Sequence, residues 1–398
     1  MASNGDIVVE VDLSAGAQTS TLTLSNAQET NTQIVTTYQT VAIGRYGATG
    51  TLRSGNDLAF SFIGMSAGIP YTSVSSIALT PDDDIMVAGF DAITHATNQP
   101  GTAKVLTRLD SKNSLNRKWA ATYPDTSYID RIFPRPIRGD YVTIGLSPDE
   151  FHGINGNIAQ VGENSSTASV LMDYLDNATE IGVDKSTLWF VGGSAGATAL
   201  SGANKLNPWS PMTWNITSGQ SFIIGAKDDG TSIGPWFTSN AGTRSAGLWK
   251  ILVNGSGDLI VLAAAGGGAS SGAVSLNGSE ILSDTDILTL FKVKAAGGAV
   301  AWKTAVTSNI QPLVTIAPDG NAVAVSPLTS TYGLTMFADA NGSVAASFTG
   351  SGQAQVITSG SSGLYVLGVV SGSADFNPGA GTDIQGNLPG MFISRFSY

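Results

Sequence analysis

The 398-residue chain has no cysteine, only two histidines and few charged side chains, which make up 12% of it. Without cysteine it cannot form disulfides, use a thiolate nucleophile or bind zinc through sulfur. No run approaches the roughly 20 apolar residues of a membrane-spanning helix. The N-terminal stretch MASNGDIVVEVDLSAG has neither the basic region nor the apolar core of a secretory signal. We therefore expect no membrane insertion and no classical signal peptide in this chain.

The formal net charge is −11 at pH 7, which argues against nucleic acid as a partner because nucleic-acid-binding proteins present a basic face. Residues 104–138 nevertheless hold eight of the 19 lysines and arginines. Three of them surround two prolines in DRIFPRPIRGD. We predict that Arg131, Arg135 and Arg138 form a docking patch for an acidic protein partner. The alternative is a solvated edge strand whose charges prevent aggregation.

The composition predicts an all-β fold. Hydrophobic residues make up 42% of the chain, which is too many for a disordered protein. Short runs of valine, isoleucine, threonine and aromatic residues alternate with glycine, asparagine, aspartate and serine, as in strands joined by turns. Few windows have apolar residues at helical spacing.

Internal repeats are the strongest signal in the sequence. One repeated unit is a strand, a turn and a second strand, as in SFIIGAKDDGTSIGPW and GLTMFADANGSVAASFTG. Seven copies of this unit occur, at residues 40–55, 103–120, 169–184, 221–236, 287–303, 333–350 and 390–398. A second hairpin lies between some of these copies, at residues 75–90, 131–146, 250–266, 313–328 and 355–372.

Two hairpins per repeat make a four-stranded antiparallel sheet, and such sheets repeated around an axis form a β-propeller. We predict that residues 1–398 form a single β-propeller of seven four-stranded blades, with six or eight blades as alternatives. The seventh copy ends after its first strand. We therefore expect the N-terminal strand at residues 5–14 to complete the blade formed by residues 350–398 and to close the ring.

The C-terminal sequence SGSADFNPGAGTDIQGNLPGMFISRFSY resembles the repeat of a broad group of bacterial β-propeller proteins. Those repeats carry a D-F-x-P-G-x-G-T loop, an apolar strand and then a tryptophan-containing strand. Here the loop spans residues 375–382, the strand is MFISRF, and the tryptophan positions match Trp119, Trp236 and Trp302 in other copies. The resemblance implies a propeller fold and no particular activity, because propellers host many unrelated functions.

Residues 192–196 read Gly-Gly-Ser-Ala-Gly, the G-x-S-x-G pattern of esterase nucleophiles. In the α/β-hydrolases, which this segment resembles locally, a catalytic histidine follows the serine along the chain. Here His95 and His152 both precede Ser194, and a serine without a base is a weak nucleophile. We therefore predict that Ser194 is a turn residue and that the chain has no catalytic constellation.

Two acidic turns, TPDDDIM at residues 80–86 and SDTDI at 283–287, are the best candidates for calcium. Neither has the alternating oxygen ligands of a calcium loop, so we expect them to accept backbone hydrogen bonds instead. We predict no metal site and no cofactor.

Three tryptophans, Trp209, Trp214 and Trp236, are concentrated in one segment. If they are exposed, they form a platform on which sugar rings stack. The alternative is that at least two of them fill the wedge between blades.

Three functions fit this sequence. The first is a non-enzymatic structural or attachment component of a large assembly, such as a phage virion or a surface appendage, with other protein subunits as partners. The second is a carbohydrate-binding propeller with glycans as ligands. The third is a propeller glycosidase, lyase or lactonase. The first predicts a location on a virion or an extracellular surface.

Overall fold

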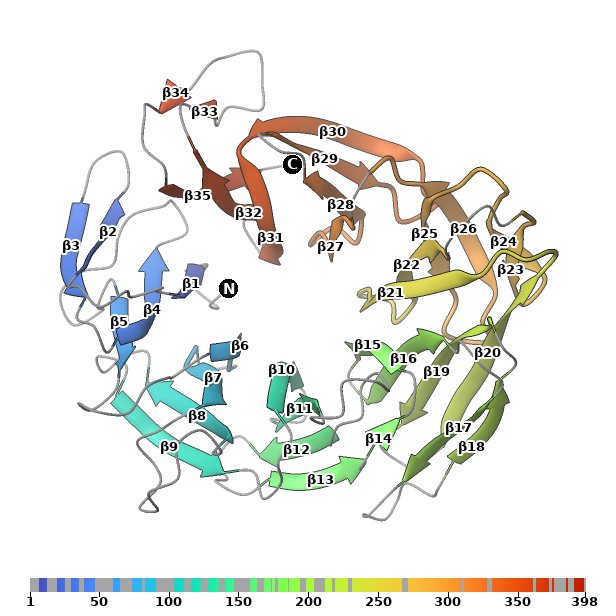
Figure 1. The fold of residues 1–398 in the computed structure, drawn as a ribbon, viewed down its shortest axis with the longest axis horizontal. Coiled ribbons are helices and arrows are strands. Elements are labelled where there is room, and N and C mark those ends of the chain that lie inside the picture. The colour runs from blue at the N-terminus through green and yellow to red at the C-terminus, as the bar shows by residue number, and fades with distance from the viewer. Residues whose placement is uncertain are drawn as a thin grey trace. The chain divides into compact units, whose positions relative to one another are not determined.

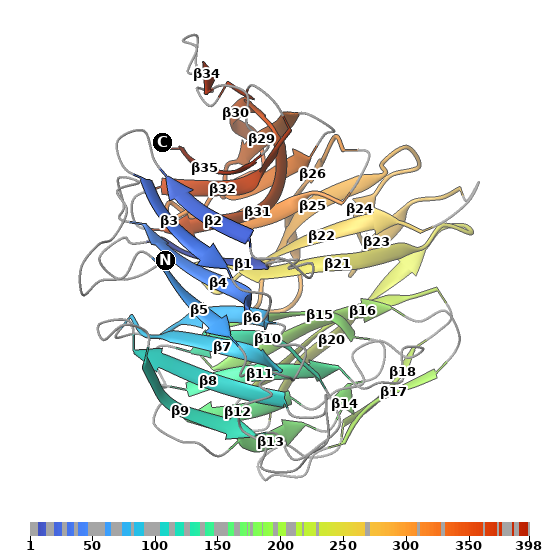
Figure 2. The ribbon, with the colours of Figure 1, turned by 60° about the vertical axis from the view of Figure 1, so that its left-hand side comes forward.

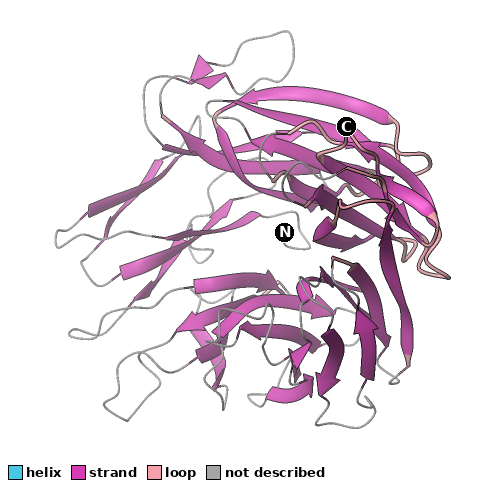
Figure 3. Ribbon diagram, turned by 45° about the vertical axis from the view of Figure 1, so that its right-hand side comes forward, coloured by secondary structure: helices cyan, strands magenta, loops and turns pink. Residues whose placement is uncertain are grey.

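The computed structural model describes residues 219–371 with gaps at 228–230, 267–270, 309–310, 328–330 and 361–362. It also describes residues 374–375, 384–385 and 390–396 and, before residue 219, the strands given below with a few flanking residues. Every regular element in this described part is a β-strand, which confirms the predicted all-β fold (Figure 3). The same residues include no helix of the length and hydropathy required to cross a membrane.

The chain divides into two compact units. The first comprises Met1–Asp176 and Ser201–Met212, and the second comprises Asn177–Leu200 and Thr213–Tyr398. Each unit consists of antiparallel sheets. Four of the ten described sheets have four strands, and these sheets join neighbouring strands in chain order. This repeated arrangement supports the predicted β-propeller, while the blade number depends on both units and stays a prediction.

In the first unit, the described strands form the following sheets (Figure 1). They are β1 (Ile7–Asp12), β4 (Gln39–Tyr46) and β5 (Phe60–Gly64); β6 (Val74–Leu79), β7 (Ile85–Phe90), β8 (Lys104–Asp110) and β9 (Asn116–Thr122); β10 (Tyr128–Arg135), β11 (Asp140–Leu146), β12 (Ile158–Gly162) and β13 (Ala168–Met172); and the pair β2 (Ser20–Ser25) and β3 (Thr30–Val35). A further small sheet, whose residues are divided between the two units, joins β14 (Tyr174–Leu175), β17 (Thr198–Ala203) and β18 (Met212–Ile216).

The second unit has four larger sheets, three of which Figures 1 and 2 show in succession from β21 to β35. They are β15 (Ala178–Val183), β16 (Thr187–Gly193), β19 (Ser221–Lys227), β20 (Ser232–Asn240), β23 (Val274–Leu276) and β24 (Ser279–Leu282); β21 (Ala246–Val253), β22 (Leu259–Ala265), β25 (Leu288–Val293) and β26 (Val300–Ala305); β27 (Leu313–Ile316), β28 (Ala322–Pro327), β29 (Thr331–Phe337) and β30 (Val344–Ser351); and β31 (Gln353–Gly360), β32 (Gly363–Val370) and β35 (Gly390–Phe396). A short pair joins β33 (Ala374–Asp375) and β34 (Ile384–Gln385).

The sequence identified most of these hairpins. All five copies of the second predicted hairpin are confirmed, as β6–β7, β10–β11, β21–β22, β27–β28 and β31–β32. Four copies of the first unit are also confirmed, as β8–β9, β19–β20, β25–β26 and β29–β30.

The hairpin predicted at residues 169–184 is wrong. In the structure β13 pairs with β12, and β15 pairs with β16. The Asp-Asn turn signal at residues 176–177 marks a step from one sheet to the next, which looks the same in the sequence as a hairpin turn.

The N-terminal strand β1 pairs antiparallel with β4, from Ile7 opposite Tyr46 to Asp12 opposite Val41. This pairing lies within the first unit. The predicted use of residues 5–14 to complete the blade at residues 350–398 would join the two units, so it stays a prediction. The hairpin predicted at residues 40–55 begins with β4, and residues 47–59 lie outside the described part.

A β-bulge recurs in the first strand of five sheets. It falls at the same place in each hairpin, between residues 74 and 76, 129 and 131, 178 and 180, 248 and 250, and 354 and 356. The residue before each bulge pairs with a small residue of the second strand, namely Gly89, Gly145, Gly192, Ala263 and Gly368. At Gly368 an added Cβ would meet the Gln353 carbonyl oxygen, so the backbones approach too closely for a side chain.

Three hydrophobic cores fill the spaces between successive sheets of the second unit. Trp189, Val261 and Phe291 represent the first, Ile260 and Phe337 the second. The third core holds Tyr332, Leu334, Val366 and Phe392, among other residues. The two middle sheets, β21-β22-β25-β26 and β27-β28-β29-β30, thus bury both faces against their neighbours in the manner of stacked blades.

Tryptophans of the outer strands close the wedge between sheets. Trp236 on β20 lies against Gly298 in the β25–β26 turn, and Trp302 on β26 lies against Gly342 in the β29–β30 turn. An added Cβ at either glycine would lie within 2.6 Å of the indole. Both glycines have positive φ, 74° and 69°. Glycine therefore serves two needs at these turns, backbone conformation and room for the indole.

Candidate functional site

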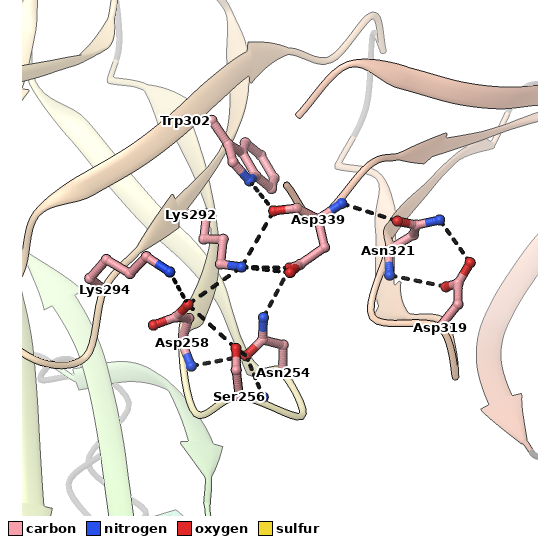
Figure 4. Close-up of polar contacts among 9 residues, drawn as sticks. All are labelled: Asn254, Ser256, Asp258, Lys292, Lys294, Trp302, Asp319, Asn321 and Asp339. Carbon is pink, nitrogen blue, oxygen red and sulfur yellow. Dashed lines mark hydrogen bonds and ion pairs between the residues drawn. The ribbon is translucent and has the colours of Figure 1, made fainter. Parts of the chain in front are cut away.

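The densest polar cluster of the described chain joins two sheets of the second unit (Figure 4). Its residues come from the β21–β22 turn, from β25 and the residue after it, from β26, from the β27–β28 turn and from the residue pair that follows β29. We name this set the inter-sheet cluster; its members are Asn254, Ser256, Asp258, Lys292, Lys294, Trp302, Asp319, Asn321 and Asp339.

Asn254 shapes its own turn and reaches the next sheet. Its side-chain oxygen accepts hydrogen bonds from the backbone N–H groups of Ser256 (3.1 Å) and Asp258 (2.9 Å). Its amide nitrogen donates to an Asp339 carboxylate oxygen at 2.9 Å. One asparagine therefore fixes the turn and links two sheets, a role suited to a side chain that both accepts and donates.

Asn321, in the turn of the other sheet, also both donates and accepts hydrogen bonds. Its backbone N–H donates to Asp319 Oδ1 at 3.0 Å, and its side-chain oxygen accepts from the Asp339 backbone N–H at 3.0 Å. The Asp339 carbonyl in turn accepts from Trp302 Nε1 at 2.8 Å. Asp339 is thus held through its backbone and its side chain.

Lys292 is the centre of the cluster. Its side chain is 5% exposed, and its ammonium lies 2.7 Å from Asp339 Oδ2 and 3.4 Å from Asp258 Oδ2. Lys294, which is half exposed, lies 2.7 Å from Asp258 Oδ2. A buried ammonium is stable only where opposite charges and acceptors surround it, and two carboxylates meet that condition here.

The cluster shifts the pKa values of two of its members, Asp258 and Lys294. Burial alone would raise the pKa of Asp258, but the hydrogen bond and charge of Lys294 and the charge of Lys292 outweigh burial and hold this pKa below its ordinary value. The hydrogen bond to Asp258 raises the pKa of Lys294 above its ordinary value. Asp258 and Lys294 are therefore charged at neutral pH and are bound to each other. This arrangement stabilises the contact between sheets, whereas a nucleophilic lysine or a general acid requires the opposite shifts.

The first unit contains a related cluster. Asp84 immediately precedes β7, as Asp258 precedes β22. Asp84 is buried and forms ion pairs with Arg108 (2.7 Å) and Lys118 (2.6 Å). Arg108 pairs with the second residue of β7, as Lys292 pairs with the second residue of β22. The hydrogen bond to Asp84 raises the pKa of Lys118.

These two sheets share one arrangement. An aspartate precedes the second strand, and a cation on the third strand neutralises it. Sequence reasoning missed this pair because the cation is an arginine in one sheet and a lysine in the other. The aspartate before an apolar strand in both sheets was the available signal.

The acidic turns considered for calcium have other partners. Asp84 already binds two cations, as described above. The backbone carbonyls of Asp284 and Asp286 both accept from the guanidinium of Arg244, and the Asp286 carboxylate accepts from the Ser283 backbone N–H at 2.8 Å. Asp286 also has a lowered pKa, because these hydrogen bonds from Ser283 outweigh the effect of burial. Over the residues described, no group of three or more histidine or acidic side chains has the spacing of a metal site.

The predicted arginine patch is only partly within the described structure. Arg131 and Arg135 belong to β10, and Arg138 lies outside the described residues. β10 stands at the edge of the sheet β10-β11-β12-β13, and Pro134 pairs in register with Tyr141. A proline is tolerated in such an edge strand, and the docking patch stays a prediction.

Trp236, one of the three tryptophans predicted as a sugar-stacking platform, does not form one. This side chain is 8% exposed and stacks on Trp189, with ring centroids 5.6 Å apart. Its indole fills the wedge at Gly298, so it offers no open face to a sugar. Trp214 belongs to β18, and Trp209 lies outside the described residues.

The esterase-like motif has a structural explanation up to its serine. β16 ends at Gly193, and Ser194 lies outside the described residues. Gly192, the first glycine of the motif, occupies the position that Gly89, Gly145 and Gly368 fill in other sheets, opposite the residue before a bulge. The repeat therefore accounts for this glycine without any catalytic role.

The comparisons with known proteins give only distant structural similarity. No protein-family model matches the chain, and no curated protein matches it. The solved structures similar to it include BamB from Moraxella catarrhalis, at 9% identity and a TM-score of 0.43, over 91% of this chain and 97% of that one. Another is the Dos1 propeller, at 10% identity and a TM-score of 0.43, over 82% of this chain and 70% of that one. A third, Porphyromonas gingivalis dipeptidyl peptidase 4, has 10% identity and a TM-score of 0.44, with 90% of this chain and 50% of that chain covered.

Proposed function

We propose that this protein is a non-enzymatic β-propeller that serves as a structural or attachment component of a large assembly, such as a virion or a surface appendage. The observation that carries the proposal is the pairing of acidic side chains in the two ion clusters. Asp84, Asp258 and Asp339 each bind a lysine or arginine. Their charges are committed to holding sheets and strands together, as suits a rigid scaffold.

The basic segment at residues 104–138 provides the docking element of this proposal. Arg131, Arg135 and Arg138 surround prolines that restrict the backbone and lower the entropic cost of presenting the arginines. Guanidinium groups bind carboxylates in a bidentate manner. Since the chain carries a formal net charge of −11, this segment is where an acidic subunit meets least repulsion.

A charge-reversal experiment tests the docking element. Arg131, Arg135 and Arg138 are all changed to glutamate, and incorporation of the variant into the parent assembly is measured by co-sedimentation and electron microscopy. We expect a folded variant that no longer incorporates, and a wild-type association that weakens as salt rises.

The control reverses Lys185, Lys205 and Arg395, an equal charge change outside the segment, and should incorporate normally. Normal incorporation of the folded arginine variant would exclude the docking patch. A wild-type protein that co-sediments with no larger particle from its native source would overturn the proposed function itself.

A further inference from the structure

One tryptophan of the second unit differs from its neighbours in exposure. Trp249 on β21 is 39% exposed, whereas Trp189, Trp236 and Trp302 are at most 8% exposed. An indole exposes a large apolar surface to water here, although the adjoining cores bury similar rings. Such an exposed aromatic side chain is informative because burial is the default for tryptophan.

The indole lies at a β-bulge. Strand β21 pairs Leu248 with Ala263 and Lys250 with Leu262, which leaves Trp249 as the extra residue. Leu248 and Ile251 on either side of it are buried. The alternation before the bulge already turns Trp249 away from the buried side of Ala246 and Leu248, and the bulge returns Ile251 to the buried side.

The ring lies close to its own strand. An added Cβ at Gly247 would lie 2.9 Å from Trp249 Nε1, so the indole lies back along its own strand over a residue without a side chain. A ring that is positioned before binding loses less entropy when a ligand stacks on it.

Polar groups lie beside this strand end. Lys250, the residue after Trp249, forms an ion pair at 3.4 Å with Glu180. Glu180 follows the equivalent bulge of β15, so the bulged ends of β15 and β21 are adjacent. The glutamate is almost fully buried, while the lysine is one-third exposed and has three N–H donors. The pair is neutral overall.

We infer that Trp249 is the stacking platform of a carbohydrate site that takes a neutral pyranose ring. The C–H face of a pyranose with equatorial hydroxyls matches an exposed indole face, and the Lys250 ammonium donates hydrogen bonds to the ring hydroxyls. A neutral sugar fits because the Lys250–Glu180 pair leaves no net charge to attract an ionic one. This site gives the proposed attachment component a sugar ligand. The biological purpose of sugar binding rests on that proposed role, and the binding itself does not.

The test is binding of neutral oligosaccharides to the isolated full-length protein. Cello-, chito- and β-galacto-oligosaccharides are screened by saturation-transfer NMR, and the affinity for the best of them is measured by isothermal titration calorimetry. We expect binding by the wild type and a loss of at least about tenfold in Trp249→Ala, since removal of an aromatic contact accounts for a change of that order. Trp249→Phe should bind with intermediate affinity.

A second variant tests positioning of the ring. Gly247→Ala keeps the indole but displaces it, so we expect weaker sugar binding with an unchanged Tm. The control Ile287→Ala removes an exposed apolar side chain elsewhere and should bind like the wild type. No binding of any saccharide, or equal affinity of the wild type and a folded Trp249→Ala variant, overturns the inference. Either result leaves the assembly proposal intact, because that proposal is judged by incorporation of the arginine variant.

Discussion

At the residue scale, Lys292 is the side chain whose removal should cost the most among the charged members of the inter-sheet cluster. Lys292→Met leaves the carboxylates of Asp258 and Asp339 without their shared buried cation. We expect the free energy of unfolding to fall by about 3 kcal/mol, the usual cost of breaking a buried ion pair from one side. Urea denaturation followed by tryptophan fluorescence measures this change.

The matched control for this prediction is Lys294→Met, which removes an ammonium from the same carboxylate of Asp258. The Lys294 side chain is 51% exposed, and exposed pairs contribute about 1 kcal/mol or less. Equal losses of unfolding free energy in the two variants would show that burial does not increase the contribution of the Lys292 charge to stability.

The lowered pKa of Asp258 predicts a dependence of stability on acid. A carboxyl group whose pKa is lower in the folded state contributes stability above its unfolded value and loses it as the pH falls through the folded value. We expect the stability difference between the wild type and Asp258→Asn to be complete well above pH 3.8 and to shrink below it. Chemical denaturation of both proteins across this range measures the difference, and a constant difference would contradict the shift.

At the element scale, the turns that receive an indole should be the least tolerant of substitution. Gly342→Ala introduces both strain at positive φ and a Cβ within 2.6 Å of the Trp302 ring. Gly278→Ala, in the β23–β24 turn, introduces only the backbone strain, because nothing lies within 4 Å of its added Cβ.

We expect Gly278→Ala to cost about 1 kcal/mol and Gly342→Ala to cost clearly more, since the indole must also move. The difference between their Tm values measures the effect of the close contact between residue 342 and the Trp302 indole. If the two variants have the same Tm, the Trp302–Gly342 contact does not contribute to stability.

The elements themselves were largely predictable from the sequence, and the contacts between them were not. Strand and turn residues alternate locally, so the hairpin at residues 250–266 was readable from its own residues. The failure at residues 169–184 came from a turn signal that leads to a different sheet. The inter-sheet cluster was not readable, because Lys292 and Asp339 are 47 residues apart and meet only through packing of two sheets. Trp249 was overlooked because nothing in the residues around it distinguishes an exposed tryptophan of a strand from a buried one.

At the scale of the whole molecule, closure of the ring by the N-terminus can be tested by hydrogen exchange. Deletion of residues 1–14 removes β1 from β4, so faster exchange is expected at residues 39–46 in any case. If residues 5–14 also complete the blade at residues 350–398, amides of β35 should lose protection as well. Mass spectrometry of peptides from both regions distinguishes the two results, and unchanged protection of β35 would exclude closure by this strand.

The β23–β24 hairpin lies in the chain between β22 and β25, yet β23 pairs with β20 of the preceding sheet, with Thr238 opposite Leu276. One repeat of the sequence therefore does not correspond to one complete sheet of the structure. Moving the segment from β21 to β26 by recombination would also move the β23–β24 hairpin, which forms the edge of the preceding sheet. Strand β20 would then lose its neighbour β23. Evolution by adding or losing single blades is thus restricted here to changes that preserve compatible outer strands on both sides. Recombination breakpoints, or engineered circular permutations, should be tolerated more readily where a sheet has no such borrowed hairpin, as between β26 and β27.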